Sequence, residues 1–350
     1  MTTANPVAAA EQLRGEASHA QELSEEHLEE HFQDHFGVGI FGRSGDKDIL
    51  FVSTIYHVGG RKWGIKDGAL IQTDLVIADT SDRRMTDNAF VANRMDAINH
   101  FDNFSVTTEP GRVVWQAGNR QVIARPPVWE VRGEHLGVDV DLQLTAIGSA
   151  VPYHGPWEGL AENGVAGNEQ LARATGSISY KGDTYVLDEG WAVRERTCLG
   201  KDFDVPALLG QKEGYIWGWC FSEALKLFCF AQGGSGHFAG RVFLKDQQID
   251  FDADNTTVEE TARWTDPTCR ATFATDWHII MASAAGRLEV NVRTWTRYLF
   301  GFHLIDGYTT HFGSLGRASG SFTFPNGNVI TMDDQIAYFE QGFATMLPAA

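Results

Sequence analysis

The sequence predicts an all-β protein with mostly antiparallel strands. From Gly37 onward, apolar runs of about four to ten residues alternate with turn signals such as Gly59-Gly60 and Pro110-Gly111. Glycine is frequent (37 residues) and aromatic residues are plentiful, with 22 Phe and 10 Trp, a composition typical of strands and turns. No long segment with a 3.6-residue period interrupts these runs, so we expect a sandwich or barrel, not a βαβ fold.

The length favours two folded domains. A chain of 350 residues is long for one domain and sufficient for two that each bury a core. The residues between 202 and 214 read as a linker between two β-rich halves. We therefore predict an N-terminal tail and acidic helix over residues 1–36, a first β domain over 37–205 and a second over 206–350.

The N-terminal region is predicted to be helical and acidic. Residues 8–36 are rich in Ala, Glu and Gln, and Ser24 is a suitable N-cap for the stretch that follows. His27, His31 and His35 recur every four residues and would share one helix face. Histidines at that spacing can bind a metal ion, but no further ligand cluster accompanies them, so we predict a solvated polar face and no metal site.

The first β-rich half contains short strands, one clear hairpin and one break. Strand-like runs occupy 38–42, 48–58, 62–79, 104–108, 112–117, 121–131 and 138–148. Residues 177–187 form a hairpin in which Gly182 supplies the turn. Residues 151–176 are rich in glycine and polar residues and are expected to form either a surface connection or a long loop over the mouth of a barrel, where loops often carry function.

The second half contains three hairpins, over residues 241–252, 278–295 and 321–332, each with turn residues between alternating arms. Trp217, Trp219 and Phe221 alternate with smaller residues and would form an aromatic wall on one face of a strand. Such a wall is part of a core or lines a ligand cavity. Residues 333–347 carry apolar side chains at helical spacing, which predicts a short C-terminal helix.

Charge and motif content exclude several classes of function. A formal net charge of −18 disfavours nucleic acid and anionic membrane surfaces as partners. No dinucleotide fingerprint, P-loop or serine-hydrolase elbow is present, so we expect no cofactor. The four cysteines have no metal or redox spacing. Without an export signal or a membrane-length apolar run we expect a cytoplasmic protein without membrane insertion; a homodimer is compatible with this composition.

Residues 191–197 are the strongest candidate for chemistry. If they form a strand, Glu195 shares one face with Trp191 and Thr197, while Arg194 and Arg196 take the other. A carboxylate on an apolar face is either the partner of a buried arginine or a working acid/base. An adjacent arginine would keep the acid ionised, which favours a base role.

This layout resembles the lipocalin-like superfamily of carotenoid 1,2-hydratase (hydroxyneurosporene synthase), whose members have two lipocalin-type barrels in tandem. The resemblance covers roughly residues 37–332 and includes one short motif, in which an aromatic turn is followed by Arg, an acid, His, Ser, Trp and Gly. Arg194 and Glu195 match the Arg–acid pair and Thr197 matches the Ser, whereas Arg196 replaces the His and Cys198 the Trp. The resemblance implies two barrels and an apolar ligand, and these departures argue against carotenoid hydration itself.

Three functions follow as expectations, and one of them is a metal-dependent enzyme that uses the N-terminal histidines; the other two need no metal. The first is a cofactor-independent acid/base enzyme, a hydratase, dehydratase, isomerase or cyclase acting on an apolar small molecule such as a terpenoid or polyketide. The second is a lipocalin-like carrier or sensor without chemistry, since a carrier pocket needs few convergent polar groups. The predicted catalytic residues are Glu195, Arg194, Glu189, His154 and His311, and the predicted substrate-binding residues are Trp191, Tyr153, Trp157, Trp217 and Tyr308.

Overall fold

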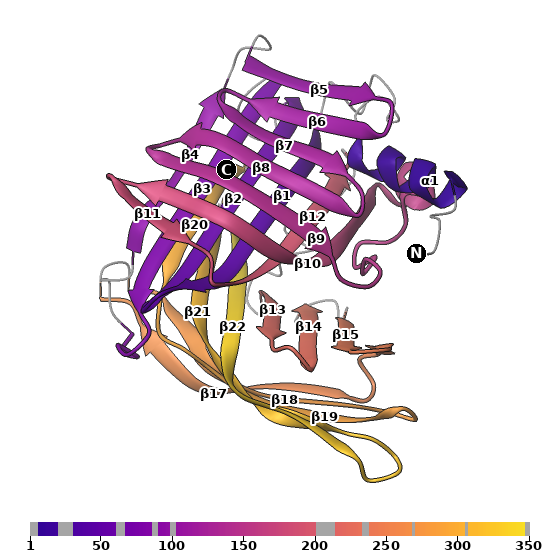
Figure 1. Ribbon diagram of the computed structural model, residues 1–350, viewed down its shortest axis with the longest axis vertical. Helices are drawn as coiled ribbons and strands as arrows, with labels where there is room; N and C mark the ends of the chain where they lie inside the picture. The colour runs from indigo at the N-terminus through magenta and orange to yellow at the C-terminus, as the bar shows by residue number, and fades with distance from the viewer. Residues whose placement is uncertain are drawn as a thin grey trace. The chain divides into compact units, whose positions relative to one another are not determined.

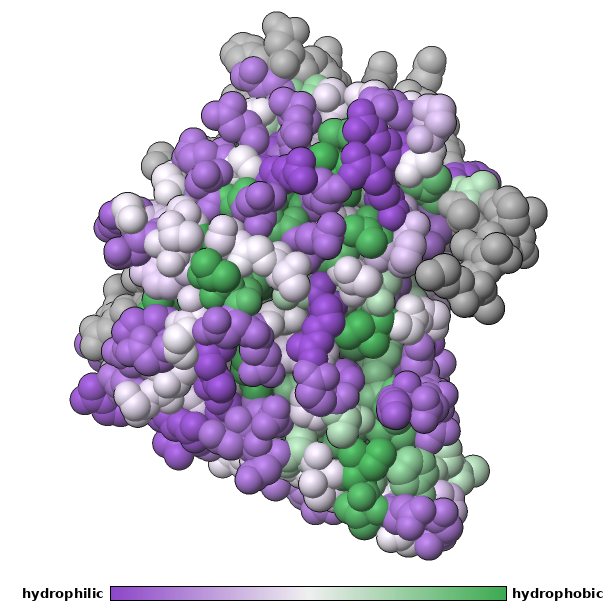
Figure 2. Space-filling view, viewed as in Figure 1, coloured by the Kyte–Doolittle hydropathy of each residue, from purple (hydrophilic) through white to green (hydrophobic). Residues whose placement is uncertain are grey.

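The structure is a computed structural model that describes residues 6–19, 31–60, 67–85, 90–98, 103–200, 214–232, 238–267, 270–304 and 307–346. Two antiparallel sheets dominate it (Figure 1), so the all-β prediction is confirmed. The chain divides into two compact units: unit 1 contains residues 1–75 and 92–203, and unit 2 contains 76–91 and 204–350. Hydrophilic side chains predominate on the face drawn in Figure 2, in keeping with the charge of the chain.

The sheet of unit 1 has the strand order β4-β3-β2-β1-β12-β10-β9-β8-β7-β6-β5, and β11 pairs with β10. Its strands are β1 (His31–Ser44), β2 (Lys47–Gly60), β3 (Asp67–Asp79), β4 (Phe90–Ile98), β5 (Phe104–Glu109), β6 (Arg112–Ala117), β7 (Arg120–Arg125), β8 (Val128–His135), β9 (Val138–Ala146), β10 (Val165–Tyr180), β11 (Asp183–Val186) and β12 (Glu189–Leu199). Helix α1 (Pro6–Glu16), the 3-10 turn η4 (Trp157–Gly159) and helix α3 (Leu160–Asn163) precede or interrupt this succession.

The sheet of unit 2 has the order β16-β15-β14-β13-β22-β21-β19-β18-β17, and β20 pairs with β21. Its strands are β13 (Tyr215–Phe221), β14 (Leu225–Gln232), β15 (Phe238–Leu244), β16 (Gln248–Phe251), β17 (Thr256–Thr265), β18 (Thr272–Ser283), β19 (Gly286–Thr294), β20 (Tyr298–Leu304), β21 (Gly307–Thr323) and β22 (Val329–Met346).

The predicted hairpins are all present. The β10–β11 hairpin pairs Tyr180 with Asp183, and Gly182 at its turn has φ +92°, a conformation that glycine adopts without strain. The second half contains the β15–β16, β18–β19 and β21–β22 hairpins. Turn chemistry and alternation therefore located these elements correctly.

Three element predictions were wrong. Residues 31–36 belong to strand β1 instead of a helix, and residues 6–16 form helix α1; His27 lies outside the described residues. The expected loop over 151–176 is short, because β10 begins at Val165 and pairs with β9 and β12. Residues 329–346 form strand β22 and not a C-terminal helix, since β13 and β21 pair with it on both sides.

The core of unit 2 lies on one face of its central strands. In unit 2 the core includes Cys220, Cys229, Trp277 and Phe339. In unit 1, Phe36 packs near Trp115 of β6, and the indole N–H of Trp115 donates to the Glu16 carbonyl at 2.8 Å, so α1 is anchored to the sheet. No helix among the described residues is long and apolar enough to cross a membrane.

Candidate active site

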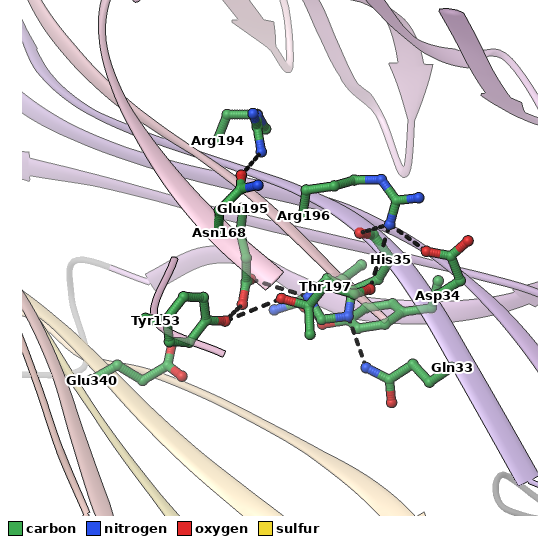
Figure 3. A network of polar contacts seen from close by, with 12 residues as sticks. Gln33, Asp34, His35, Tyr153, Asn168, Arg194, Glu195, Arg196, Thr197 and Glu340 are labelled. Atoms are coloured by element: carbon green, nitrogen blue, oxygen red, sulfur yellow. Dashed lines mark hydrogen bonds and ion pairs between the residues drawn. The ribbon is translucent and has the colours of Figure 1, made fainter. Parts of the chain in front are cut away.

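Strand β12 separates two different sets of charged residues onto its two faces. Arg194 and Arg196 point to one side, toward the rings of Trp129 and Trp115, whereas Glu195 and Thr197 point to the other side (Figure 3). This is the alternation expected of a strand. The consequence is that neither arginine forms the ion pair of Glu195.

The arginine face is a buried charge network. Arg196 pairs with Asp34 of β1, both side chains being fully buried, and its guanidinium lies 4.7 Å from the ring centre of Trp115. Arg194 pairs with Glu16 of α1 at 2.8 Å, and these two side chains are 3% and 1% exposed. Buried charges need such partners, so these pairs hold α1 and β1 against the centre of the sheet.

Glu195 lies at the centre of a separate polar group. The Tyr153 hydroxyl donates to Glu195 Oε1, and His35 Nε2 lies 3.3 Å from Oε2. Gln33 Nε2 is 2.8 Å from His35 Nδ1, and the Tyr153 hydroxyl is also 3.2 Å from Thr197 Oγ1. The Glu195 side chain remains 31% exposed, so a carboxylate with two partners stays accessible. We refer to Glu195, His35 and Tyr153 as the Glu195 triad.

The pKa values of Glu195 and Tyr153 are shifted in opposite directions. Burial alone would raise the pKa of Glu195, but the charge of His35 and hydrogen bonds from His35 and Tyr153 outweigh it and lower this pKa to about 2. Burial and then the Glu195 charge raise the pKa of Tyr153 well above its usual value. At neutral pH the site therefore holds a carboxylate base beside a phenol that keeps its proton.

The tautomer of His35 follows from its neighbours. With the Gln33 amide donating to Nδ1, the neutral ring carries its proton on Nε2 and donates it to Glu195. A 180° flip of the Gln33 amide presents its oxygen instead and accommodates the imidazolium. Gln33 thus orients His35 in either state.

Small residues leave room beside the triad. Gly37 of β1 is directly opposite Glu195, and a Cβ at that position would lie 3.2 Å from both Glu195 Oε2 and Thr54 Oγ1. A Cβ at Gly167 of β10 would lie 2.7 Å from Thr197 Oγ1. Side chains at these two positions would crowd the carboxylate and the hydroxyl, so glycine is required for this geometry.

Two other predicted residues lie on or next to the triad. Tyr153 is a member of it, and the ring of His154 packs on the Tyr153 ring with centroids 3.8 Å apart; the positive charge of His154 also helps to lower the pKa of Glu195. Glu189 and Trp191 lie further along β12, where the Trp191 indole N–H is 3.3 Å from Glu189 Oε1 and Arg173 covers the Trp191 ring at 3.5 Å. They form a separate stacked group.

Trp157, a predicted substrate contact, packs elsewhere. Its ring stacks on His19 with centroids 4.1 Å apart, and Arg196 lies 5.4 Å from its centre. It also packs against the small apolar cluster of Phe32, Leu160, Ala166 and Cys198. These neighbours belong to the arginine side of β12.

The remaining predicted residues are in unit 2. His311 of β21 is 2.8 Å from the Tyr215 hydroxyl and 3.5 Å from Glu340 Oε1, and Trp217 of β13 lies edge-on to Tyr338. The Tyr308 side chain is 43% exposed. Among the described residues, no group of three or more His, Cys, Asp and Glu side chains could hold a metal ion.

Sequence reasoning missed His35 and Gln33 as site residues. The sequence predicts His35 in an N-terminal helix. Nothing in that prediction brings the helix next to Glu195, which is distant in the sequence. The signal available was the alternation of Phe32, Asp34 and Phe36 with Gln33, His35 and Gly37, which fits a strand with one polar face.

Comparison with known proteins supports the fold. No family model matches the chain, and no curated protein matches it. Among solved structures, kievitone hydratase from Nectria haematococca is similar with a TM-score of 0.57 at 10% identity, covering 89% of each chain. An AttH-type protein from Nitrosomonas europaea has a TM-score of 0.59 at 10% identity, covering 89% of this chain and 92% of the other. CghA, in complex with Sch210972, has a TM-score of 0.58 at 12% identity, covering 90% and 89%.

These similarities extend over nearly the whole chain. Because the sequence identities are low, they establish the fold and nothing further. The chain therefore has the lipocalin-like tandem-barrel fold of these proteins, as the sequence resemblance implied.

Proposed function

We propose that the Glu195 triad is the acid/base centre of a cofactor-independent enzyme that adds or removes water, isomerises or cyclises a hydrophobic small molecule, such as a terpenoid or polyketide. The observation that carries the proposal is the convergence of Tyr153 and His35 on one partly exposed carboxylate. A carrier site needs few polar groups, whereas proton transfer needs a coupled set in hydrogen-bond reach. One protein of the same fold is named a hydratase, which agrees with this class of reaction.

The charge states favour proton abstraction as the first step. Glu195 is ionised at neutral pH and accepts a proton from a substrate carbon next to a carbonyl group. The C–H electron pair moves to the carbonyl oxygen, and the resulting enolate oxygen accepts a hydrogen bond from Tyr153, which retains its proton. In a β,γ-unsaturated carbonyl compound the enolate is conjugated with the alkene, and return of the proton from Glu195 to the γ carbon moves the double bond and isomerises the substrate. In a β-hydroxy carbonyl compound the enolate electron pair re-forms the carbonyl group and expels the β-hydroxyl, which takes the proton from Glu195 and leaves as water, so the product is an α,β-unsaturated carbonyl compound.

Tyr153 also adjusts the strength of the base. In the free protein its hydroxyl donates to Glu195 and helps to lower the pKa of that carboxyl. When the hydroxyl turns to a substrate oxygen, Glu195 loses this hydrogen bond and its pKa rises. The carboxylate thus becomes a stronger base once substrate is present.

The test is proton exchange catalysed by the whole chain. A panel of β-hydroxy ketones and enones with apolar skeletons is incubated in D2O, and uptake of deuterium and loss or gain of water are followed by mass spectrometry. Glu195→Gln is expected to slow turnover about 10²- to 10⁴-fold, with the circular dichroism spectrum unchanged. Glu162→Gln, at an exposed position of α3, is the matched control and should retain full activity. Unchanged turnover in Glu195→Gln, or substrate binding without any exchange in the wild type, contradicts the proposal and leaves the carrier.

A further inference from the structure

Unit 2 contains a polar group that lies in the same place in its sheet as the Glu195 triad does in unit 1. In each unit the acid belongs to a long strand that pairs on one side with the first strand of its sheet, β12 with β1 and β22 with β13. Glu195 is directly opposite Gly37, and Glu340 is directly opposite Trp217. Two positions earlier on those first strands are His35 and Tyr215, and each contacts the acid of its own unit.

The third strand contributes to the polar group in unit 2 alone. β12 also pairs with β10, and β22 with β21. In unit 2 this strand supplies His311, so that a histidine and a tyrosine meet the carboxylate in both units. Their origins differ: in unit 1 the first strand supplies the histidine and Tyr153 comes from the segment before η4, whereas in unit 2 the first strand supplies the tyrosine.

Glu340 is surrounded by hydroxyl groups. The Tyr215 hydroxyl donates to Oε1, the Tyr338 hydroxyl donates to Oε2 at 2.7 Å, and the Tyr298 hydroxyl is 3.3 Å from Oε2. His311 Nδ1 lies 2.8 Å from the Tyr215 hydroxyl and 3.5 Å from Glu340 Oε1. We refer to Glu340, His311, Tyr215, Tyr298 and Tyr338 as the Glu340 cluster.

The cluster is on the face of the sheet opposite to the core. Phe339, the residue before Glu340, belongs to the core of unit 2 and stacks on Trp277 with centroids 4.6 Å apart. Glu340 therefore points the other way, and its side chain is 13% exposed. The tyrosines that hold this carboxylate are themselves buried, and a carboxylate enclosed in such a polar group favours a binding role.

Aromatic rings flank the carboxylate. Phe300 stacks on His311 with centroids 4.4 Å apart and planes at 6°, and Trp217 meets Tyr338 edge-on at 5.3 Å. Trp217 and Phe300 are both partly exposed. A flat apolar ligand can thus contact ring faces while its polar end reaches Glu340.

The polar groups suit a hydroxyl group in particular. A hydroxyl donates one hydrogen bond and accepts others, and the cluster offers a carboxylate acceptor beside tyrosine donors. An ammonium group can donate hydrogen bonds but cannot accept them, so it would leave the tyrosine O–H groups without an acceptor and place its positive charge next to them. We propose that the Glu340 cluster is a second binding site that recognises the hydroxyl group of an aromatic or otherwise apolar molecule.

The test compares two probes that differ by one hydroxyl group. Calorimetric titration of the full chain with 2-naphthol and with naphthalene should show binding about tenfold or more tighter for 2-naphthol, since a hydrogen bond to a charged group contributes at least that factor. Glu340→Gln should abolish this preference and leave naphthalene binding unchanged. Glu340→Asp, which keeps the charge but withdraws it by one methylene, should reduce the preference, and Glu259→Gln, at an exposed position of β17, should not.

Three results overturn the proposal: no measurable binding of 2-naphthol, equal affinity for both probes in the wild type, or a preference that survives both Glu340 substitutions. If Glu340→Gln does not fold, Glu340→Asp decides alone. The outcome is independent of the function proposed for the Glu195 triad, because that function fails on the turnover of Glu195→Gln and this inference fails on naphthol affinity.

Discussion

Replacement of Arg196 by methionine tests whether the arginine face of β12 stabilises the fold, as distinct from the face that carries Glu195. Arg196 and Asp34 are both fully buried, and the guanidinium also donates to the carbonyl oxygens of Ala17 and of His35. Arg196→Met leaves the Asp34 charge in the core with the His19 backbone N–H as a remaining donor, at 2.7 Å. Removing one partner of a buried pair costs about 3–5 kcal/mol.

That free energy corresponds to a measurable fall in melting temperature. For a unit of roughly 150–250 residues, 1 kcal/mol shifts the midpoint by about 2–4 °C, so Arg196→Met should melt about 6–20 °C lower in the unit 1 transition. Differential scanning calorimetry at pH 7 measures this shift. The double variant Arg196→Met/Asp34→Leu should regain most of the loss, since it leaves no unpaired charge.

A surface pair supplies the comparison. Arg287 and Glu289 are about half exposed, so Arg287→Met should change stability by no more than about 1 kcal/mol. The reasoning is refuted if Arg196→Met melts within 2 °C, roughly 1 kcal/mol, of the wild type. It is equally refuted if the double variant is no more stable than the single one.

Three further results are expected. The pKa of Glu195 is lowered to about 2 in the folded protein, from about 4.5 in the unfolded chain. The ionised carboxylate therefore stabilises the fold above pH 4.5, and this contribution is lost as the pH falls towards 2. The melting temperatures of wild type and Glu195→Gln should converge over that range. Burial and, second, the charge of Arg196 lower the pKa of His19 to about 4. The folded protein should therefore lose stability as the pH drops from about 6.5 to 4. If His19→Gln shows the same dependence of melting temperature on pH in this range, the assignment is contradicted. Gly37→Ala should displace the Glu195 carboxylate, because the added Cβ lies 3.2 Å from it; we expect lower kcat with a melting temperature close to wild type, and unchanged kcat would show that the site tolerates the methyl group.

Local sequence patterns were sufficient for the hairpins and for the two faces of β12. Turn residues between alternating arms specify a reversal whatever surrounds it, so the β10–β11 and β21–β22 hairpins could be predicted. Alternation in a strand is equally local, and it correctly separated Glu195 from Arg194 and Arg196.

Spacings of four residues were ambiguous. Four is close to one helical turn, but it is also an even number, so a histidine spacing of four in the sequence fits one strand face as well as one helix face. The same holds for Phe339 and Phe343. Strands β1 and β22 form because each has a neighbour on both sides whose backbone groups complete its hydrogen bonds, and no local pattern contains that information.

The sequence by itself determined which residue types occur together along each strand, and hence that one carboxylate of residues 191–197 faces away from its neighbouring arginines. Only the tertiary structure decided their partners: Glu16 and Asp34 for the arginines, and His35 and Tyr153 for Glu195. The physical reason is that these contacts depend on strand register and on chain segments up to about 180 residues apart. Such pairings are set by the whole sheet and the burial it produces.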